Sequence, residues 1–277
     1  MAELLEPAVE GHNAQRVALC IEYNGSSFNG WQSQKSQDVA TVQETLESAL
    51  AKVANHPVKL TCAGRTDTGV HGIGQVVHFD FDNPRSEEAW VRGGNSHLPD
   101  TVSVRWARQV SQDFHARFSA SARRYRYIIY NNAVRPALLS KLVTPHYIPL
   151  NEKAMHEAGQ QLLGENDFTS FRGATCQSST PMRNVQALSI KRQDDFVIMD
   201  IQANAFLLHM VRNIAGTLME IGEGGKPVSW AGEVLAMKDR TQAGATVPPD
   251  GLYLAGVVYP DEFDLPESPE GPVILGF

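Results

Sequence analysis

The sequence has little of what several classes of protein require. Only three cysteines occur in 277 residues, and they lie far apart, which predicts neither a disulfide framework nor a thiolate metal site. No run approaches the ~18 consecutive apolar residues of a membrane span, and the acidic first fifteen residues do not resemble a secretory signal. With 42% hydrophobic and 20% charged residues, the composition is globular. We expect a cytoplasmic protein without membrane contact.

Common cofactor signatures are also missing. The chain has neither a G-x-x-x-x-G-K-[ST] phosphate loop nor a G-x-S-x-G nucleophile elbow. Residues 69–74 have the order G-x-x-G-x-G and precede a predicted strand, whereas a dinucleotide fingerprint follows a strand and opens a helix. His71 and His78 have no third ligand at a suitable spacing, which argues against zinc. We therefore expect no metal and no cofactor.

The net charge of −7 is unevenly distributed. Residues 1–15 and 260–277 hold eight acids and no Lys or Arg, so removing them leaves +1 for the body of the chain. Between residues 104 and 126, six arginines stand against one acid, a local charge of +5. Tyr125 interleaves with these arginines, which favours a nucleic-acid partner, although a solvated charged face is the other interpretation.

Hydrophobic periodicity predicts two successive α+β units. The first has strands over 17–23, 58–63, 75–81 and 102–110, a helix behind the capping box of Thr41 and Glu44, and a helix over 86–94. The second has a strand over 123–130, a helix over 151–163 with Asn151 as N-cap and Gly164 as stop, a hairpin over 185–203, a helix over 206–221 and a strand over 252–259. This order is the split βαβ arrangement.

The predicted fold is therefore α+β, with two tandem βαββαβ units of the ferredoxin or RRM type. We expect their sheets to lie side by side around a central basic cleft. Residues 1–115 would form the N-terminal domain, which carries the loop of Asp67. Residues 116–277 would form the C-terminal domain, which ends in an acidic tail that contains prolines.

One loop between two predicted strands is a candidate site. It places Arg65 and Asp67 between Gly64 and Gly69, where glycines permit a sharp turn and close approach of a ligand. A neighbouring base can keep a carboxylate ionised beside a substrate. The spacing leaves open that Asp67 and Thr68 merely build an Asx-type turn.

The string GRTDTGVHG of this loop closely resembles the active-site motif of the tRNA pseudouridine synthase A family. Further blocks follow in the family's order: IEYNGSSFNGWQ (21–32), HFDF (78–81), DFHARFSASARRYRYIIYN (113–131), LLGENDFTSFR (162–172), ANAFLLHMVRNIAG (203–216) and GLYL (251–254). The resemblance implies the pseudouridine synthase fold and an isomerase, an intramolecular transferase. Its reaction would convert uridine to pseudouridine at positions 38, 39 and 40 in the anticodon stem-loop of tRNA. It also implies a homodimer.

The resemblance assigns roles to five residues. Asp67 would be the catalytic nucleophile, or the base that starts a glycal route, and Arg212 would pair with it. Arg65 would flip and hold the RNA. Tyr125 would stack on the target uracil and handle the C5 proton, and Leu252 would pack against the uracil.

The predicted strand over 123–130 independently supports an RNA-binding role for this segment. Tyr125 and Tyr127 share one face of such a strand, and Arg124 and Arg126 share the other. Because an arginine face suits phosphates, we expect Arg124 and Arg126 to bind the substrate. An aromatic face suits a base, although a pair of tyrosines more often belongs to the hydrophobic core. Arg212 lies off the apolar stripe of its predicted helix, where it faces either a cleft or solvent.

Two other classes of function compete. A non-catalytic RNA-binding protein of two RRM-like units would use the same arginines and aromatics and need no Asp67, but neither half contains an RNP-type motif. A carboxylate-dependent nucleoside hydrolase would need a second acid near Asp67, and none neighbours it in the sequence. The sequence therefore favours the isomerase.

Overall fold

The structure is a computed structural model that describes residues 15–32, 40–83, 85–267 and 271–272. Among these residues, ten strands form one sheet with the main path β4-β1-β3-β10-β5-β9-β8-β7, with β2 beside β3 and β6 beside β5. The strands are β1 (Gln15–Tyr23), β2 (Thr61–Cys62), β3 (His71–Phe81), β4 (Val102–Val110), β5 (Ala122–Asn131), β6 (Thr144–His146), β7 (Gly164–Asp167), β8 (Met182–Gln193), β9 (Phe196–Ala203) and β10 (Leu252–Val258). The α-helices are α1 (Val42–Ala54), α2 (Glu87–Asn95), α3 (Glu152–Gln160), α4 (Met210–Gly222) and α5 (Trp230–Met237).

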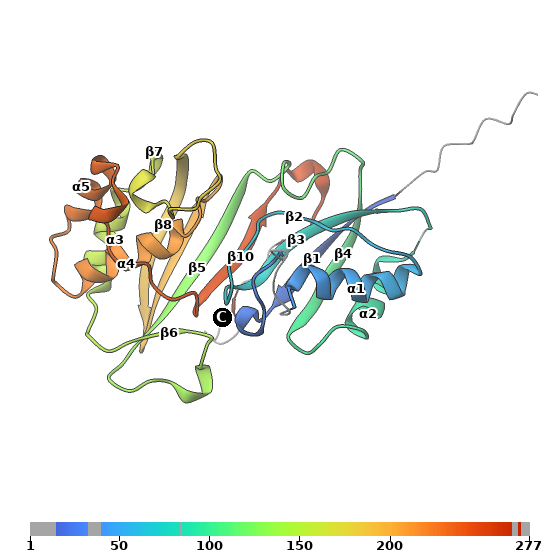
Figure 1. Ribbon diagram of the computed structural model, residues 1–277, viewed down its shortest axis with the longest axis horizontal. Helices are drawn as coiled ribbons and strands as arrows, with labels where there is room; N and C mark the ends of the chain where they lie inside the picture. Colours follow the sequence, from blue (N-terminus) through green and yellow to red (C-terminus); the bar gives the residue numbers. More distant parts are fainter. Residues whose placement is uncertain (1–14, 33–39, 84, 268–270, 273–277) are drawn as a thin grey trace, which may run out of the picture.

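The first half of the sheet is covered by α1 and α2 (Figure 1). Alternate residues of β1 enter a core with both helices, where Leu19, Leu46 and Trp90 are at most 1% exposed. The predicted capping box starts α1: the Thr41 hydroxyl accepts from the Glu44 N–H, and the Glu44 carboxylate accepts from the Thr41 N–H. Burying each large apolar side chain contributes about 1.5–3 kcal/mol, so this core anchors the strands beside the candidate loop.

The second half of the sheet packs against α3 and α4, and α5 packs against these two helices (Figure 1). Asn151 caps α3 as predicted, since its Oδ1 accepts from the N–H groups of Lys153 and Ala154 at 3.1 Å each. The helix ends at Gln160, three residues before the predicted end. Gly164, with a φ of +88°, opens β7. The short β6 and β7 and the helix α5 were not predicted.

β10, the last strand in the part of the chain that the structure describes, joins the two halves. β10 runs parallel to β3, with Tyr253 opposite His71, and antiparallel to β5, with Leu252 opposite Tyr127. The two sheets predicted to lie side by side are thus one continuous sheet, because β10 satisfies the backbone edges of both β3 and β5. The α+β fold class is confirmed, and the division at residues 115 and 116 stays a prediction.

Candidate active site

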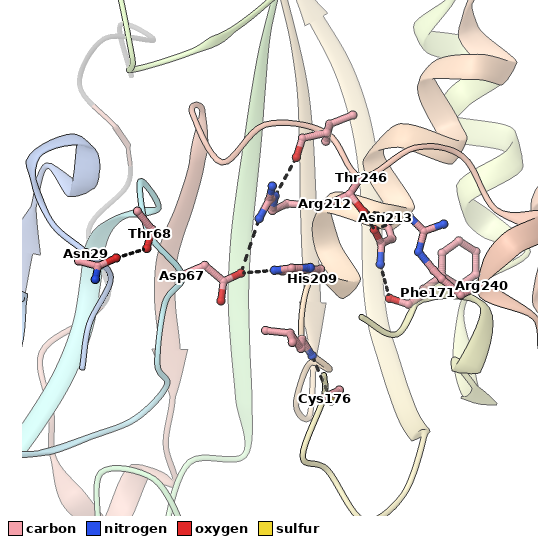
Figure 2. A network of polar contacts seen from close by, with 12 residues as sticks. Asn29, Asp67, Thr68, Phe171, Cys176, His209, Arg212, Asn213, Arg240 and Thr246 are labelled. Atoms are coloured by element: carbon pink, nitrogen blue, oxygen red, sulfur yellow. Dashed lines mark hydrogen bonds and ion pairs between the residues drawn. The ribbon is translucent and has the colours of Figure 1, made fainter. Parts of the chain in front are cut away.

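The loop that carries Asp67 is fixed by the segment that follows β1. The Tyr23 hydroxyl is hydrogen-bonded to Thr66 Oγ1 at 2.8 Å in the interior, and the Trp31 N–H donates to the Thr66 carbonyl at 3.0 Å. At the base of the loop, the fully buried Gln75 amide donates to the Gly64 carbonyl. The loop is therefore braced on both sides, and the Asp67 side chain points across a cavity toward α4 (Figure 2).

The cavity has a volume of about 1180 Å³ and lies between the two halves of the sheet. Its lining comes from the segment after β1, the loop before β3, β5, residues 175–177, α4 and its preceding turn, and β10 with the residue Pro249 before it. The five residues with roles implied by the resemblance all line it: Arg65, Asp67, Tyr125, Arg212 and Leu252. Folding thus brings together residues from four separate stretches of sequence.

Two nitrogen donors of α4 and its N-cap face the Asp67 carboxylate. His209 Nε2 lies 3.5 Å from Asp67 Oδ2, and Arg212 Nη1 lies 3.8 Å from the same oxygen. The Asp67 side chain is one-third exposed. These distances are within ion-pair range but longer than a normal hydrogen bond. The expected pairing of Arg212 with Asp67 is therefore present as a close approach across the cavity.

A hydrogen-bonded network behind Arg212 fixes its guanidinium. Arg212 Nε donates to the Val247 carbonyl at 2.7 Å. The preceding residue of that segment, Thr246, donates to Asn213 Oδ1 at 2.6 Å, and the Asn213 amide donates to the Phe171 carbonyl at 2.8 Å (Figure 2). Asn213 is fully buried, so breaking this network would leave unpaired polar groups in the interior. The position of Arg212 is accordingly set by tertiary contacts.

Tyr125 and Leu252 form the apolar wall of the cavity. The Tyr125 ring meets Phe206 edge-on, with centroids 5.0 Å apart, and Leu252 is 5% exposed. Burial, and then the negative charge of Asp67, raise the pKa of the Tyr125 phenol well above its ordinary value. The phenol therefore stays protonated at neutral pH, where its O–H is a hydrogen-bond donor. Tyr127 lies on the same face of β5 as Tyr125 but belongs to the hydrophobic core, where its hydroxyl is hydrogen-bonded to Thr144 Oγ1 at 2.7 Å.

The structure does not bring Arg124 and Arg126 to the cavity. They occupy the opposite face of β5, where their Nε atoms lie 2.6 Å from the two carboxylate oxygens of Asp200 on β9. The alternation of faces was predicted correctly, but the face with the arginines is not the face that carries Asp67 and Tyr125. Arg65, by contrast, is exposed at the cavity.

Sequence reasoning missed His209, whose ring approaches the carboxylate as closely as Arg212. The predicted helix over 206–221 begins only at Met210, because His209 has left-handed backbone angles, φ 59° and ψ 6°. A polar residue within the apolar periodicity of 206–221 was the only available signal. Within the described ranges, no three His, Cys, Asp or Glu side chains form a metal-ligand group, and no helix is long and apolar enough to cross a membrane.

Comparison with known proteins identifies the family. The family described as tRNA pseudouridine synthase matches residues 19–119 and 158–260, more than half of the chain. The tRNA pseudouridine synthases A of Shigella boydii serotype 4 and Escherichia fergusonii are each 58% identical over 260 residues, which cover 94% of this chain and 96% of each relative. That of Salmonella arizonae is 57% identical over the same shares.

The chain therefore belongs to the tRNA pseudouridine synthase family. The expectation of an isomerase of this family is confirmed, and the alternative of a non-catalytic RNA-binding protein is set aside. A solved structure, that of a Cbf5–Nop10–Gar1 complex, aligns with 89% of this chain and 59% of the solved chain at 11% identity. Its TM-score of 0.32 is too low to add to the assignment.

Proposed function

We propose that the protein isomerises uridine to pseudouridine at positions 38, 39 and 40 of the tRNA anticodon stem-loop, with Asp67 as the catalytic carboxylate. The observation that carries this proposal is the convergence of Asp67, Tyr125 and Arg212 in one cavity of about 1180 Å³. Ligand pockets commonly measure ~300–1,000 Å³, so there is room for an extruded nucleotide and its phosphates. The three tRNA positions are supported by the family resemblance.

The reaction exchanges one bond to the sugar for another. The N1–C1′ bond breaks, the detached uracil turns, and C5 bonds to C1′; C5 then loses its proton and N1 gains one, so no atom is added in net. Asp67 acts either as the nucleophile at C1′ or as the base that starts a glycal route. Arg212, 3.8 Å away, places a positive charge beside the carboxylate that both routes use.

The wall of the cavity suits a flipped base. Extruding a stacked nucleotide costs a few kcal/mol, and stacking on an aromatic ring offsets about 1–3 kcal/mol of this. Tyr125 would hold the detached uracil and relay the C5 proton through its neutral hydroxyl, while Leu252 confines the ring. Arg65 at the rim would contact the RNA backbone, where a guanidinium binds phosphate well.

The assembly and location are proposed on the resemblance alone. We propose a cytoplasmic homodimer in which one tRNA contacts both subunits. Sedimentation of the protein with and without tRNA tests this part, and a monomer that modifies tRNA at the full rate would contradict it.

Replacing Asp67 tests the catalytic assignment. Asp67→Asn keeps the size of the side chain and removes its charge, so we expect pseudouridine formation to fall by several orders of magnitude, each tenfold being ~1.4 kcal/mol of barrier. Asp67→Glu keeps the charge but moves the carboxylate, and ~1 Å of misplacement costs ~100-fold. Because the side chain is one-third exposed, both variants should fold and bind tRNA like the parent.

The assay is release of tritium from C5-labelled uridine in tRNA, since only the isomerase exchanges this hydrogen. Mapping the modified nucleotides tests the three positions separately. Asp82→Asn is a matched control, because Asp82 is an exposed acid outside the cavity. A folded Asp67→Asn protein that still makes pseudouridine at a substantial rate would contradict the assignment of Asp67 as the catalytic carboxylate.

A further inference from the structure

His209 lies at the N-cap of α4 in an unusual conformation. Its φ of 59° places it in the left-handed region, which a non-glycine residue occupies at a free-energy cost. The side chain makes no capping hydrogen bond to the helix that it precedes. The conformation is therefore not explained by the start of the helix. Instead, the ring extends into the cavity toward Asp67 (Figure 2).

The turn over 173–176 holds the backbone of Leu208, the residue before His209. The Gly173 N–H donates to the Leu208 carbonyl at 2.8 Å, and the Leu208 N–H approaches Cys176 Sγ at 3.5 Å. A Cβ on Gly173 would come within 3.2 Å of His209 Nδ1, so the missing side chain makes room for the ring. The imidazole is thus confined between Gly173 on one side and the Asp67 carboxylate on the other.

His209 and Arg212 approach the same oxygen of Asp67. The recorded ion-pair contacts, at 3.5 Å and 3.8 Å, both involve Oδ2. Arg212 is tied at Nε to the Val247 carbonyl, which restricts its approach to the carboxylate. A second nitrogen at the same oxygen adds a constraint on the rotation of the carboxylate. A carboxylate partner also favours the imidazole tautomer with its proton on Nε2.

We propose that His209 is a positioning residue, whose Nε2–H together with Arg212 holds Asp67 Oδ2 and leaves Oδ1 aimed at the sugar of the flipped uridine. This inference rests on the proposed function, in which Asp67 is the catalytic carboxylate. The free-energy cost of the left-handed backbone is retained because only that conformation turns the ring toward the carboxylate.

Three substitutions separate positioning from folding. His209→Gly relieves the left-handed backbone, so its melting temperature should not fall below that of the parent, while kcat should fall about 10- to 100-fold through misplacement of Asp67. His209→Asn tolerates the same backbone but is too short to reach Oδ2, and should match His209→Gly. His209→Gln carries a donor of greater reach and should recover most of the lost rate. The Kd for tRNA should stay within about threefold throughout, because no contact with the RNA backbone is removed.

Asn55→Gly is the matched control. Asn55 has a φ of 61°, is exposed at the C-cap of α1, and lies outside the cavity. Asn55→Gly also replaces a left-handed residue with glycine, and it should leave kcat unchanged.

The steady-state kcat values and tRNA affinities of these variants decide the proposal. Parent-like kcat in His209→Gly, with Asp67→Asn inactive, overturns the role of His209 and leaves the proposed function standing. A His209→Gln protein no faster than His209→Gly, or a loss confined to tRNA affinity, also overturns it. An active Asp67→Asn protein would instead refute the proposed function itself.

Discussion

Gly30 offers a test of how closely the catalytic loop is braced. It has a φ of +77°, and a Cβ at this position would lie 2.9 Å from the Thr66 carbonyl oxygen and 3.2 Å from the Asp67 carbonyl carbon. Gly30→Ala therefore combines two perturbations. One is a left-handed alanine, and the other is a steric contact with the backbone of the loop that carries the carboxylate.

The two contributions can be estimated separately. A left-handed non-glycine residue costs roughly 1–2 kcal/mol, and overpacking a well-filled site costs typically ~1–3 kcal/mol, so we expect a loss of about 2–5 kcal/mol in unfolding free energy. To restore an ordinary contact of 3.4 Å, the loop must retreat by about 0.5 Å. Since ~1 Å of misplacement costs ~100-fold, a shift of this size should lower the single-turnover rate roughly tenfold.

Gly164→Ala is the matched control, because Gly164 has a φ of +88° and no atom within 4 Å of its added Cβ. It should lose only the ~1–2 kcal/mol of the backbone and keep the parent rate. Urea unfolding and single-turnover pseudouridine formation measure both quantities. Equal destabilisation of the two variants, with full activity in Gly30→Ala, would refute the proposed contact between Gly30 and the loop.

Two further predictions concern ionisable groups. Tyr125→Phe keeps the stacking ring and removes the hydroxyl, so tRNA affinity should persist while tritium release from C5 falls; an unchanged release rate would limit Tyr125 to stacking. Burial lowers the pKa of His78, which is 5% exposed, to about 4. In the unfolded chain, His78 has its ordinary pKa near 6.5 and is therefore protonated at a higher pH than in the folded protein. The free energy of unfolding should be intact above pH 7 and fall by on the order of 3 kcal/mol between pH 6.5 and 4. His78→Gln should lack this component in urea unfolding across that pH range, and an equally steep loss in the variant would contradict the assignment.

Local features of the fold were predictable from the sequence because their causes are local. The strand β4 matches its predicted residues 102–110, and the capping box at Thr41 and the N-cap at Asn151 form as their side chains dictate. Alternation along β5 correctly separated Tyr125 from Arg124. The five lining residues with implied roles were identified through the resemblance of their motifs; the spacing around Asp67 alone left a simple turn open.

Tertiary structure decided what local patterns leave free. Alternation indicates which residues share a face, but the side that faces a cavity depends on where other strands and helices pack, and Asp200 on β9 pairs the arginines on the far face. Likewise, the position of β10 between β3 and β5 depends on strand pairings distant in sequence. The helical periodicity runs through His209 without interruption. Its left-handed backbone and the approach of its ring to Asp67 are set by tertiary structure, which is why the ring at the carboxylate could not be predicted.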